Sequence, residues 1–553
     1  MSQPTQRPKF HPTPLPATSS ILRSSLPWLP VLSAPAPFPC ASFSPTLTAL
    51  LQHPEHSGPL ILRANPLPPP VPPIPASTEH FPGWRPVEIT RRRLMPRVPE
   101  RDGELVQTCV RYRPSEPGRE GEMLVLIPEL AEGERPPYYH PDVERLALVY
   151  TAHASPHPAS EEEPEEHGTL RIEVVLPPSA PSAINPSSRL YRTTLHLLET
   201  AHKHSWGHYA CYKKRVRHDI LVPREAYQDL YLRLKARHKH HVASWALGTD
   251  PRKHVFEDVA IAAFLMLLWK GEYPGLEEGR PPATDDDAGE CEWSTWGRPE
   301  GGFVDLGCGN GLLVHILLQE GYSGYGVDLT ARKTWSTYPS STQQHLHTSA
   351  ITPLSIPPVS PPIPTGAFLI GNHPDELTPY VPLLATLSRA SGWLAIPCCP
   401  FTFTGRFTSQ VYKSKLGASE VERRMDEGGE GGGRVRAYLV YLEEVGRRLG
   451  WDVGVEALRM PSTRNWGLVG RRRALSPTAE SERGDEEVLE EGMGGLSLNG
   501  TSAATPHGTR VNGADSEKPV TITREDGLRW AEDKLEEIRR SGGFTVREGK
   551  GHH

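Results

Sequence analysis

The second half of the chain is predicted to form a doubly wound α/β domain, and three observations support this. Short apolar segments such as Phe303–Asp305 and Gly324–Asp328 end in an acidic residue. Segments with helical spacing of apolar residues separate these predicted strands. A turn with a glycine at every second position, from Gly307 to Gly311, joins the first strand to a helix. Strands that alternate with helices indicate a mostly parallel sheet with helices on both faces.

The length of 553 residues, with 59 prolines and 49 glycines, predicts several domains joined by long loops. We expect residues 1–20 to be disordered and residues 21–185 to form an irregular α+β N-terminal region. Residues 186–300 are predicted to be a helical, basic region with a linker. Residues 301–472 form the predicted α/β domain, and residues 473–553 a mostly disordered acidic tail with a short helix.

The individual elements follow from local patterns in the sequence. Apolar runs between turn-forming residues predict strands in the N-terminal region, at 124–127, 147–150 and 170–176. Apolar residues at helical spacing predict helices at 190–201, 224–238 and 256–269, the last of them almost wholly apolar and therefore buried. Within the α/β domain, strands are predicted at 303–305, 324–328, 367–370, 392–396, 453–458 and 466–469. Helices are predicted at 312–319, from about 377 to 390, at 434–449 and, as a solvated helix, at 524–540.

Charge and cysteine content restrict the class of protein. The net charge of −6 combines a strongly acidic segment at 480–491 with a strongly basic one at 189–254. Seven cysteines without paired spacing predict a reducing compartment, hence a cytoplasmic protein, and we expect no metal site. The sequence has no run of about 18 apolar residues, so no membrane span is predicted.

The glycine turn is predicted to bind a nucleoside cofactor. Glycines let the backbone turn sharply and approach a ligand closely. A dinucleotide such as NAD would require G-x-G-x-x-G, whereas the spacing here is G-x-G-x-G. Asp305 would repel a pyrophosphate but suits the sulfonium and ammonium of S-adenosylmethionine (AdoMet), and Asp328 is placed to accept two ribose hydroxyls. The predicted cofactor-binding residues are Asp305, Gly307, Gly309, Asn310, Gly311, Asp328 and Asn372.

Two other interpretations of this segment stay open, namely an NAD site and a glycine turn that binds nothing. His315 lies within the apolar helix that follows the turn, and we expect it to be a core histidine rather than a ligand.

Residues 201–219 interleave cationic and aromatic side chains, a pattern typical of RNA contacts because cations neutralise phosphates and aromatic rings stack on unpaired bases. The predicted RNA-binding residues are Lys203, Trp206, Lys213, Lys214 and Arg215. The alternative is a solvated basic loop whose aromatic side chains pack inward. The basic runs at 91–93 and 233–241 also favour an extended acidic partner.

Seven segments occur in an order typical of one family: 202–208, 212–219, 253–262, 305–315, 324–329, 371–376 and 461–466. Together they resemble the eukaryotic tRNA (uracil-2′-O-)-methyltransferase family, and the proline-rich N-terminus resembles that of a filamentous fungal member. The resemblance implies a Rossmann-like class I AdoMet-dependent methyltransferase domain, AdoMet as cofactor and serine tRNA as partner. It also implies 2′-O-methylation of the ribose of uridine-44.

The chain departs from the family pattern in two respects. Some members end in a Cys3His zinc finger, but no cysteine follows Cys399, so zinc is not expected. The loop between Tyr338 and Pro364 is rich in proline and serine and shows no clear residue for contact with adenine.

Methyl transfer to a ribose hydroxyl requires in-line positioning and a base, or a cation that stabilises the developing alkoxide. The predicted catalytic residues are Asp375, Arg464, Lys253 and His373, with Arg406 and Lys413 as further candidate cations. Asp375 follows the predicted strand at 367–370, and His373 is a candidate base because an unperturbed imidazole titrates near neutrality. The alternative is that 372–375 form only a turn and a helix cap, and that the cations are ordinary surface charges. Methylation of another RNA or of protein, and a tRNA-binding scaffold without catalysis, are the competing functions.

Overall fold

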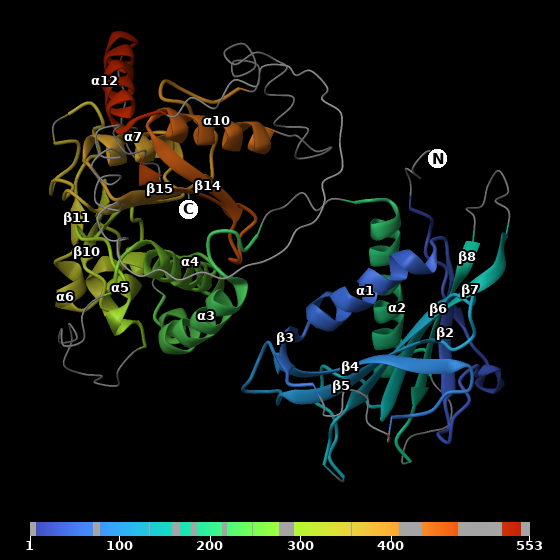
Figure 1. The fold of residues 1–553 in the computed structure, drawn as a ribbon. Helices are drawn as coiled ribbons and strands as arrows, with labels where there is room; N and C mark the ends of the chain where they lie inside the picture. The colour runs from blue at the N-terminus through green and yellow to red at the C-terminus, as the bar shows by residue number, and fades with distance from the viewer. Residues whose placement is uncertain are drawn as a thin grey trace, which may run out of the picture. The chain divides into compact units, whose positions relative to one another are not determined.

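The chain folds into two units, which divide between Lys213 and Lys214 in a computed structural model (Figure 1). The structure describes residues 7–69, 78–131, 133–157, 166–178, 185–212, 218–245, 247–275, 292–355, 357–408, 434–473 and 522–542. Among these residues, no helix combines the length and the apolar character needed to cross a lipid bilayer.

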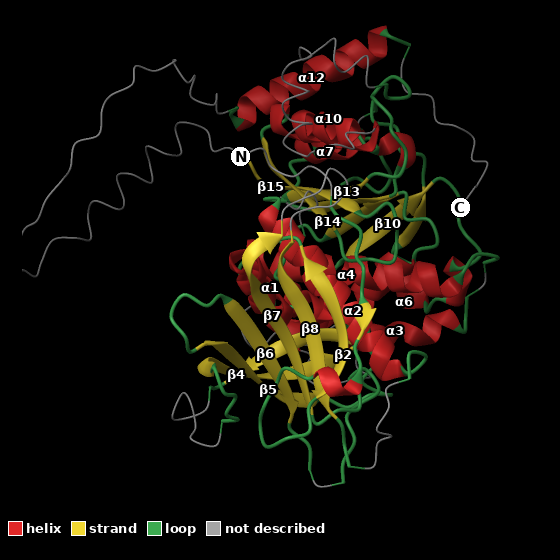
Figure 2. Cartoon of the chain, turned by 90° about the vertical axis from the view of Figure 1, so that its right-hand side faces the viewer, coloured by secondary structure: helices red, strands yellow, loops and turns green. Residues whose placement is uncertain are grey.

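The first unit is built on an eight-stranded antiparallel sheet with the order β1-β2-β8-β7-β6-β5-β4-β3. Figure 2 shows its long strands β2, β8, β7 and β6 side by side. The strands are β1 (Thr13–Pro14), β2 (Leu29–Ala36), β3 (Ile61–Leu67), β4 (Trp84–Pro96), β5 (Leu105–Pro114), β6 (Gly121–Pro128), β7 (Arg145–His157) and β8 (Glu166–Val175). The helices are α1 (Cys40–Gln52), α2 (Arg189–Tyr209) and the short 3-10 turns η1 (Ala17–Ser19) and η2 (Pro54–His56).

Apolar side chains cover both faces of this sheet. Helices α1 and α2 contribute residues such as Leu47 and Leu198 to a core that also contains Leu148 and Ile172 of the sheet. A second cluster, which includes Tyr112, contains the strand residues that alternate with the first set. This alternation is the two-residue period of a strand whose faces are both covered.

The regular sheet contradicts the expected irregular N-terminal region, although the three strands predicted there are confirmed within β6, β7 and β8. The prolines that suggested irregularity are accommodated at strand irregularities, because the pairing register shifts next to Pro30 in β2 and next to Pro86 in β4. The predicted region 186–300 is also divided, since α2 belongs to the first unit and the following helices belong to the second.

The second unit contains a seven-stranded sheet with the order β11-β10-β9-β12-β13-β15-β14, in which β15 runs antiparallel to β13 and β14. Its strands are β9 (Phe303–Leu306), β10 (Gly324–Asp328), β11 (Leu346–Thr348), β12 (Phe368–Asn372), β13 (Gly392–Ile396), β14 (Trp451–Ala457) and β15 (Trp466–Arg473). Its helices are α3 (Arg224–His238), α4 (Pro251–Glu272), α5 (Leu312–Gln319), α6 (Ser340–Gln343), α7 (Tyr380–Leu387), α10 (Arg434–Arg448) and α12 (Arg524–Arg540). The 3-10 turns are η3 (Lys239–Val242), η4 (Glu292–Thr295), η5 (Trp335–Thr337) and η6 (Asp375–Leu377).

Helices cover both faces of this second sheet, as the sequence predicted (Figure 1). One core contains α3, α4 and α5 together with strand residues such as Phe303, and the other contains α7, α10 and α12 together with Val304. Neighbouring residues of one strand therefore enter different cores. The second unit is a doubly wound α/β domain.

Helix α12 differs from the prediction that it is solvated. Its capping box, formed by Thr523 and Asp526, begins the helix, and Ala531, Leu535 and Ile538 are buried in the core shared with α7 and α10. Because most residues of this helix are charged or polar, its narrow stripe of apolar residues at helical spacing was not predicted to be buried.

Replacement of Trp269 by alanine tests the packing of α4. The indole is fully buried, with its ring centroid 6.2 Å from that of Phe303 and 5.5 Å from that of Phe368. We expect Trp269→Ala to lower the free energy of unfolding of the second unit by about 3–5 kcal/mol, because it leaves a cavity. Urea denaturation measures this value, and Val435→Ala on the exposed side of α10 should change it by less than about 0.5 kcal/mol.

His202 makes the stability of the first unit depend on pH. Burial between the rings of Phe10 and Phe38 lowers the pKa of His202 from 6.5 to about 4. Between these two values the unfolded chain binds a proton that the folded chain does not bind. The free energy of unfolding should therefore decrease as the pH falls, by up to about 1.4 kcal/mol per pH unit.

His202→Phe should reduce this slope, and urea titrations from pH 7.5 to 5 measure it. The matched variant His80→Phe, at an exposed position, should retain the wild-type slope. Equal slopes for His202→Phe and the wild type would contradict the assignment.

Candidate active site

Parallel strand pairing brings the predicted cofactor residues to one edge of the second sheet. β9 pairs with β12 so that Asp305 faces Ile370, and with β10 so that Leu306 faces Val327. Beyond these pairs, three segments lie at one edge of the sheet. They are the glycine turn that follows β9, Asp328 at the end of β10, and Asn372 at the end of β12. In parallel sheets with helices on both faces, ligands bind at this carboxyl edge of the strands.

The glycine turn has the open shape that a ligand requires. Gly307, Gly309 and Gly311 have φ values of +79°, +53° and +77°, which side chains with a Cβ rarely adopt. A Cβ placed on Gly307 or Gly309 would meet nothing within 4 Å, so open space lies beside both residues. The Gly309 N–H donates to Asp328 Oδ2 at 2.9 Å, which ties the turn to the end of β10.

Side chains of η5 and of the residues next to it donate hydrogen bonds to the backbone carbonyls of the glycine turn. Trp335 Nε1 donates to the carbonyl of Gly309 at 2.9 Å, and Thr334 and Tyr338 donate to the carbonyl of Asn310 at 2.7 and 3.1 Å. The Asn310 side chain accepts a hydrogen bond from the N–H of Leu312, the first residue of α5. His315 of α5 is buried and bonds to Thr342, as expected of a core histidine.

Three carboxyl groups are buried close to this turn. Asp305 is 2% exposed, and its Oδ1 has no hydrogen-bond partner among the described residues. Burial, with the negative charge of Asp328 as a second cause, raises the pKa of Asp305 to about 8. Burial also raises the pKa of Asp258 well above its ordinary value, and the charges of Glu257 and Asp305 add to the effect. Unpaired buried carboxylates are costly, so the turn fits a cationic nucleoside such as AdoMet.

Helix α4 contributes two functional candidates that the sequence reasoning missed. Asp258 Oδ1 accepts a hydrogen bond from Asn372 Nδ2 at 3.3 Å, and Glu257 Oε1 lies 3.1 Å from His373 Nε2. The signal was present in the sequence, because two adjacent acids in an otherwise apolar, buried helix are rarely tolerated without a partner or a function.

The segment after β12 has an unusual backbone. His373 and Asp375 have φ values of +54° and +44°, although neither is a glycine. Strained residues of this kind cluster at functional sites. The Asp375 carboxylate accepts a hydrogen bond from the Cys398 thiol at 2.9 Å, and burial, followed by that carboxylate, raises the pKa of Cys398.

The structure joins two of the four predicted catalytic residues and places the other two, His373 and Lys253, after β12 and on α4. Arg464 donates to the carbonyl of Cys398, whose thiol bonds Asp375, so Arg464 and Asp375 are joined through one residue. Lys253 is exposed on the first turn of α4, four residues before the Glu257 that bonds His373. Arg406 lies over the ring of Phe401, whereas Lys413 falls outside the described residues.

Asp375, Cys398 and Cys399 form the one group of possible metal ligands within the described part of the chain, with donor atoms within 4.8 Å of one another. The Arg464 guanidinium lies 3.8 Å from Cys399 Sγ, and the Cys398 thiol donates to Asp375. A cation beside the cluster and an internal hydrogen bond within it favour a polar network over a metal site.

Two of the predicted RNA-binding residues can be located. Lys203 is exposed on α2 of the first unit. Trp206 is only 7% exposed and packs edge-on against Tyr209 in the core, so the predicted stacking of a base on its ring is not supported. Lys213, Lys214 and Arg215 lie outside the described residues.

The end of the basic-aromatic segment is anchored within the second unit. The buried carboxylate of Glu456 accepts from the N–H groups of Asp219, Ile220 and Leu221 at 3.1, 3.0 and 2.7 Å. Asp219 also accepts two hydrogen bonds from Arg459. This part of the segment has a structural role.

Several cations of the two additional basic runs form bonds within their own unit, whereas Lys239 is exposed, so the role of these runs as RNA contacts stays a prediction. Arg91 forms a two-bond pair with Glu129, and Arg92 is buried and bonds Gln107. Arg237 and His238 both contact Glu320, a buried carboxylate at the end of α5.

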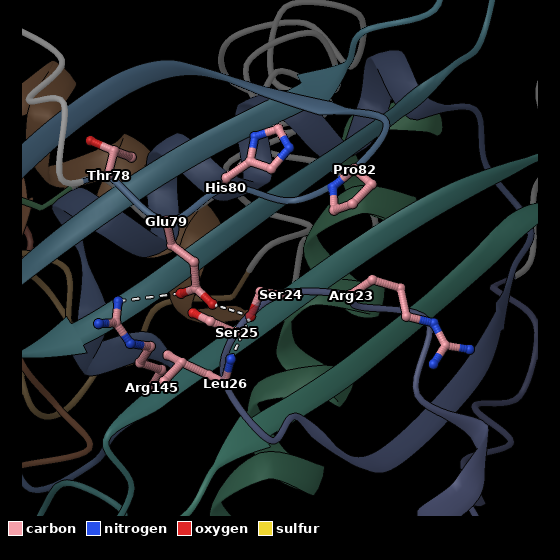
Figure 3. Close-up of a pocket in the computed structure, with 9 residues that line it drawn as sticks. All are labelled: Arg23, Ser24, Ser25, Leu26, Thr78, Glu79, His80, Pro82 and Arg145. Atoms are coloured by element: carbon pink, nitrogen blue, oxygen red, sulfur yellow. Dashed lines mark hydrogen bonds and ion pairs between the residues drawn. The ribbon is translucent and has the colours of Figure 1, made fainter.

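A cavity of about 640 Å³ lies in the first unit, and Figure 3 shows the residues that line it. Its acid, Glu79, pairs with Arg145 at 3.3 Å and accepts hydrogen bonds from Ser24 and Trp28. These contacts fasten the segments around Ser24 and Glu79 to β7. We therefore interpret the polar groups here as structural.

Comparisons with known proteins agree with this geometry. Residues 5–215 match the family model described as "TRM44-like, N-terminal bet v1-like domain", and residues 221–279 and 293–353 match "Predicted AdoMet-dependent methyltransferase". The second unit is thus an AdoMet-dependent methyltransferase domain, and AdoMet is its cofactor. No solved structure is significantly similar.

Curated relatives of similar length identify the family. The chain is 36% identical over 408 residues to the tRNA (uracil-O(2)-)-methyltransferase of Schizosaccharomyces pombe, covering 69% of this chain and 71% of the relative. The proteins of the same name from Neurospora crassa and Saccharomyces cerevisiae are 34% and 31% identical, covering 69% and 70% of this chain and 72% and 70% of the relatives. The family resemblance found in the sequence motifs is confirmed, and the chain belongs to the tRNA (uracil-O(2)-)-methyltransferase family.

Proposed function

We propose that this protein methylates the ribose 2′-oxygen of uridine-44 in serine tRNA, with AdoMet as methyl donor and the cytoplasm as its location. The family relationship supports a tRNA uridine as the acceptor, since the relatives carry the name tRNA (uracil-O(2)-)-methyltransferase. The choice of serine tRNA and of uridine-44 rests on the motif resemblance.

The observation that carries the proposal is the group of buried acids beside an open glycine turn. Asp258, Asp305 and Asp328 are 6%, 2% and 7% exposed, and burial disfavours the ionised form of the first two. A ligand with positive charge would relieve this cost, whereas a pyrophosphate would increase it. The acids therefore favour AdoMet over NAD.

The strand order supports a Rossmann-like class I methyltransferase fold. Five strands, β11, β10, β9, β12 and β13, are parallel and have β9 at their centre, and β15 enters antiparallel between β13 and β14. The order reverses at β9, which is the switch point where doubly wound sheets bind nucleosides.

The residues present fit AdoMet, which supplies an electrophilic methyl group when bound. The free Oδ1 of Asp305 would hold its positively charged part. Asp328 would accept the ribose hydroxyls, because each of its oxygens, although bonded to the N–H of Gly309 or Thr330, retains a second lone pair. Leu329, 36% exposed, offers apolar surface next to Asp328 for the adenine ring.

Exposed cations at the rim of the site support an RNA acceptor. Arg252 and Lys253 are exposed at the start of α4, and Arg464 is exposed beside Cys399. In the first unit, Lys203 presents a further cation. We propose that these residues bind tRNA phosphates.

Binding of AdoMet should release a proton at pH 7. With a pKa of about 8, Asp305 is mostly protonated without a ligand, and a cation beside it would ionise it. Calorimetry in two buffers of different ionisation enthalpy should give close to one proton released per AdoMet. Asp305→Asn should abolish the release and weaken binding at least tenfold.

The control for this experiment is Asp452→Asn, which changes an exposed acid on β14. It should bind AdoMet and release the proton as the wild type does. Unchanged affinity and proton release in Asp305→Asn would place the cofactor elsewhere.

The acceptor is tested with labelled AdoMet and a serine tRNA transcript. We expect the label in a 2′-O-methyluridine at position 44, identified by nuclease digestion and mass spectrometry. A transcript with 2′-deoxyuridine at position 44 should accept no label, because it lacks the nucleophile. Label in a base, or equal labelling of the deoxy transcript, would refute the proposal.

A further inference from the structure

Helix α4 and the end of β12 bring a carboxylate and an imidazole into direct contact. Glu257 Oε1 lies 3.1 Å from His373 Nε2, with 9% of the Glu257 side chain and 23% of the His373 side chain exposed. A carboxylate accepts hydrogen bonds, so Nε2 carries the proton of the neutral ring. The other ring nitrogen, Nδ1, is then the acceptor.

The position of Nδ1 is unusual. It is buried and has no hydrogen-bond partner among the described residues, and the His373 backbone is held in the left-handed region at φ +54°. A buried polar atom without a partner in a strained residue points to a missing ligand group. Asn372, the preceding residue, bonds Asp258 beside the cofactor turn, so this group would lie close to the methyl donor.

We propose that Glu257 and His373 form the base of the reaction, in which His373 Nδ1 takes the proton of the ribose 2′-hydroxyl and Glu257 positions the ring. The assignment rests on the proposed function, since it requires a ribose hydroxyl as nucleophile. His373 is the catalytic residue of the pair, and Glu257 is a positioning residue.

The step balances in atoms and electrons. The O–H bond of the 2′-hydroxyl breaks and its proton joins His373 Nδ1, while the oxygen forms a bond to the methyl carbon. The sulfur–methyl bond breaks and its electron pair stays on sulfur, which converts the sulfonium to a thioether. The imidazolium later gives its proton to solvent, and no oxidant or further reactant is needed.

The charges around the pair suit this role. Burial by itself would raise the pKa of Glu257, but the hydrogen bond from His373, with Ser462 and His254 adding to it, lowers this pKa below its ordinary value, so the group is ionised at neutral pH. Burial raises the pKa of the neighbouring Asp258 well above its ordinary value. Adjacent carboxyl groups with opposite shifts are typical of active sites.

The other groups that face Glu257 are Ser462, which donates a hydrogen bond to it, and His254, whose charge acts on it from one turn earlier in α4. Ser462 belongs to the same segment as Arg464. The pair is therefore surrounded by three segments of the family motifs: α4, the end of β12 and the loop before β15.

Kinetics of three variants test the pair. With the wild-type protein active on serine tRNA, His373→Ala should lower kcat by about 10²–10⁴-fold, the usual contribution of a general base. Glu257→Gln should lower kcat by at least about tenfold, and Glu257→Asp should recover part of the loss. AdoMet affinity, measured by calorimetry, should stay within about twofold for all three, which also verifies that they fold. The control is Glu272→Gln. Glu272 lies at the other end of α4 and pairs with Arg471 of β15, so this variant should retain wild-type kcat.

An NMR spectrum of the imidazole N–H groups supplies a readout that does not depend on activity. The hydrogen bond from His373 Nε2–H to Glu257 should give a downfield N–H resonance in the wild type, and Glu257→Gln should weaken or shift it. A kcat within threefold of wild type in His373→Ala or in Glu257→Gln would overturn the proposal while leaving the methyltransferase function intact. If the wild type instead fails to methylate serine tRNA, the proposed function fails, and with it the base assignment; the N–H resonance would then still report whether the hydrogen bond between His373 and Glu257 forms.

Discussion

The parallel pairing of β9 with β10 and β12 is the constraint on which the rest of the site depends. This register sets Asp305, Asp328 and Asn372 at one edge of the sheet, although they are separated by up to 67 residues in the chain. Backbone hydrogen bonds of the three strands hold the positions, while the glycine turn between β9 and α5 leaves space beside them. Helix α4 then closes the edge with two acids that enter an otherwise apolar interface.

The electrostatics of this edge support the proposal that it binds the cofactor. Burial of Asp258 and Asp305 costs free energy unless they are protonated or meet a cation. A protein that served only as a scaffold would gain stability by replacing them with neutral side chains. Their presence together, beside an unpaired Asp305 oxygen and two open glycines, is accounted for by a positively charged cofactor. The neighbouring Glu257 differs from these two acids, because its hydrogen bond with His373 outweighs burial and lowers its pKa.

Much of the fold and the cofactor half of the site could be predicted from sequence because local signals specify them. The strand ends with acids, the glycine turn and the helix at 312–319 were all found where the structure has them. The sheet of the first unit was missed, because its prolines lie at shifts of pairing register that no local pattern reveals. Trp206, Arg92 and α12 were interpreted as exposed, because they lie in segments rich in charged residues. In the structure, contacts with distant parts of the chain bury both side chains and one apolar stripe of α12.

The sequence by itself determined the cofactor class, the family and most elements of the second unit, although the short β11 and α6 were not predicted. Each of these depends on residue types at short spacing, which backbone geometry and ligand charge constrain directly. Only the tertiary structure decided which side chains meet: Glu257 with His373, Asp258 with Asn372, and Asp375 with Arg464 through Cys398. These contacts join segments more than 60 residues apart, except for the 23 residues between Asp375 and Cys398, and they follow from sheet register and helix packing rather than from any local pattern.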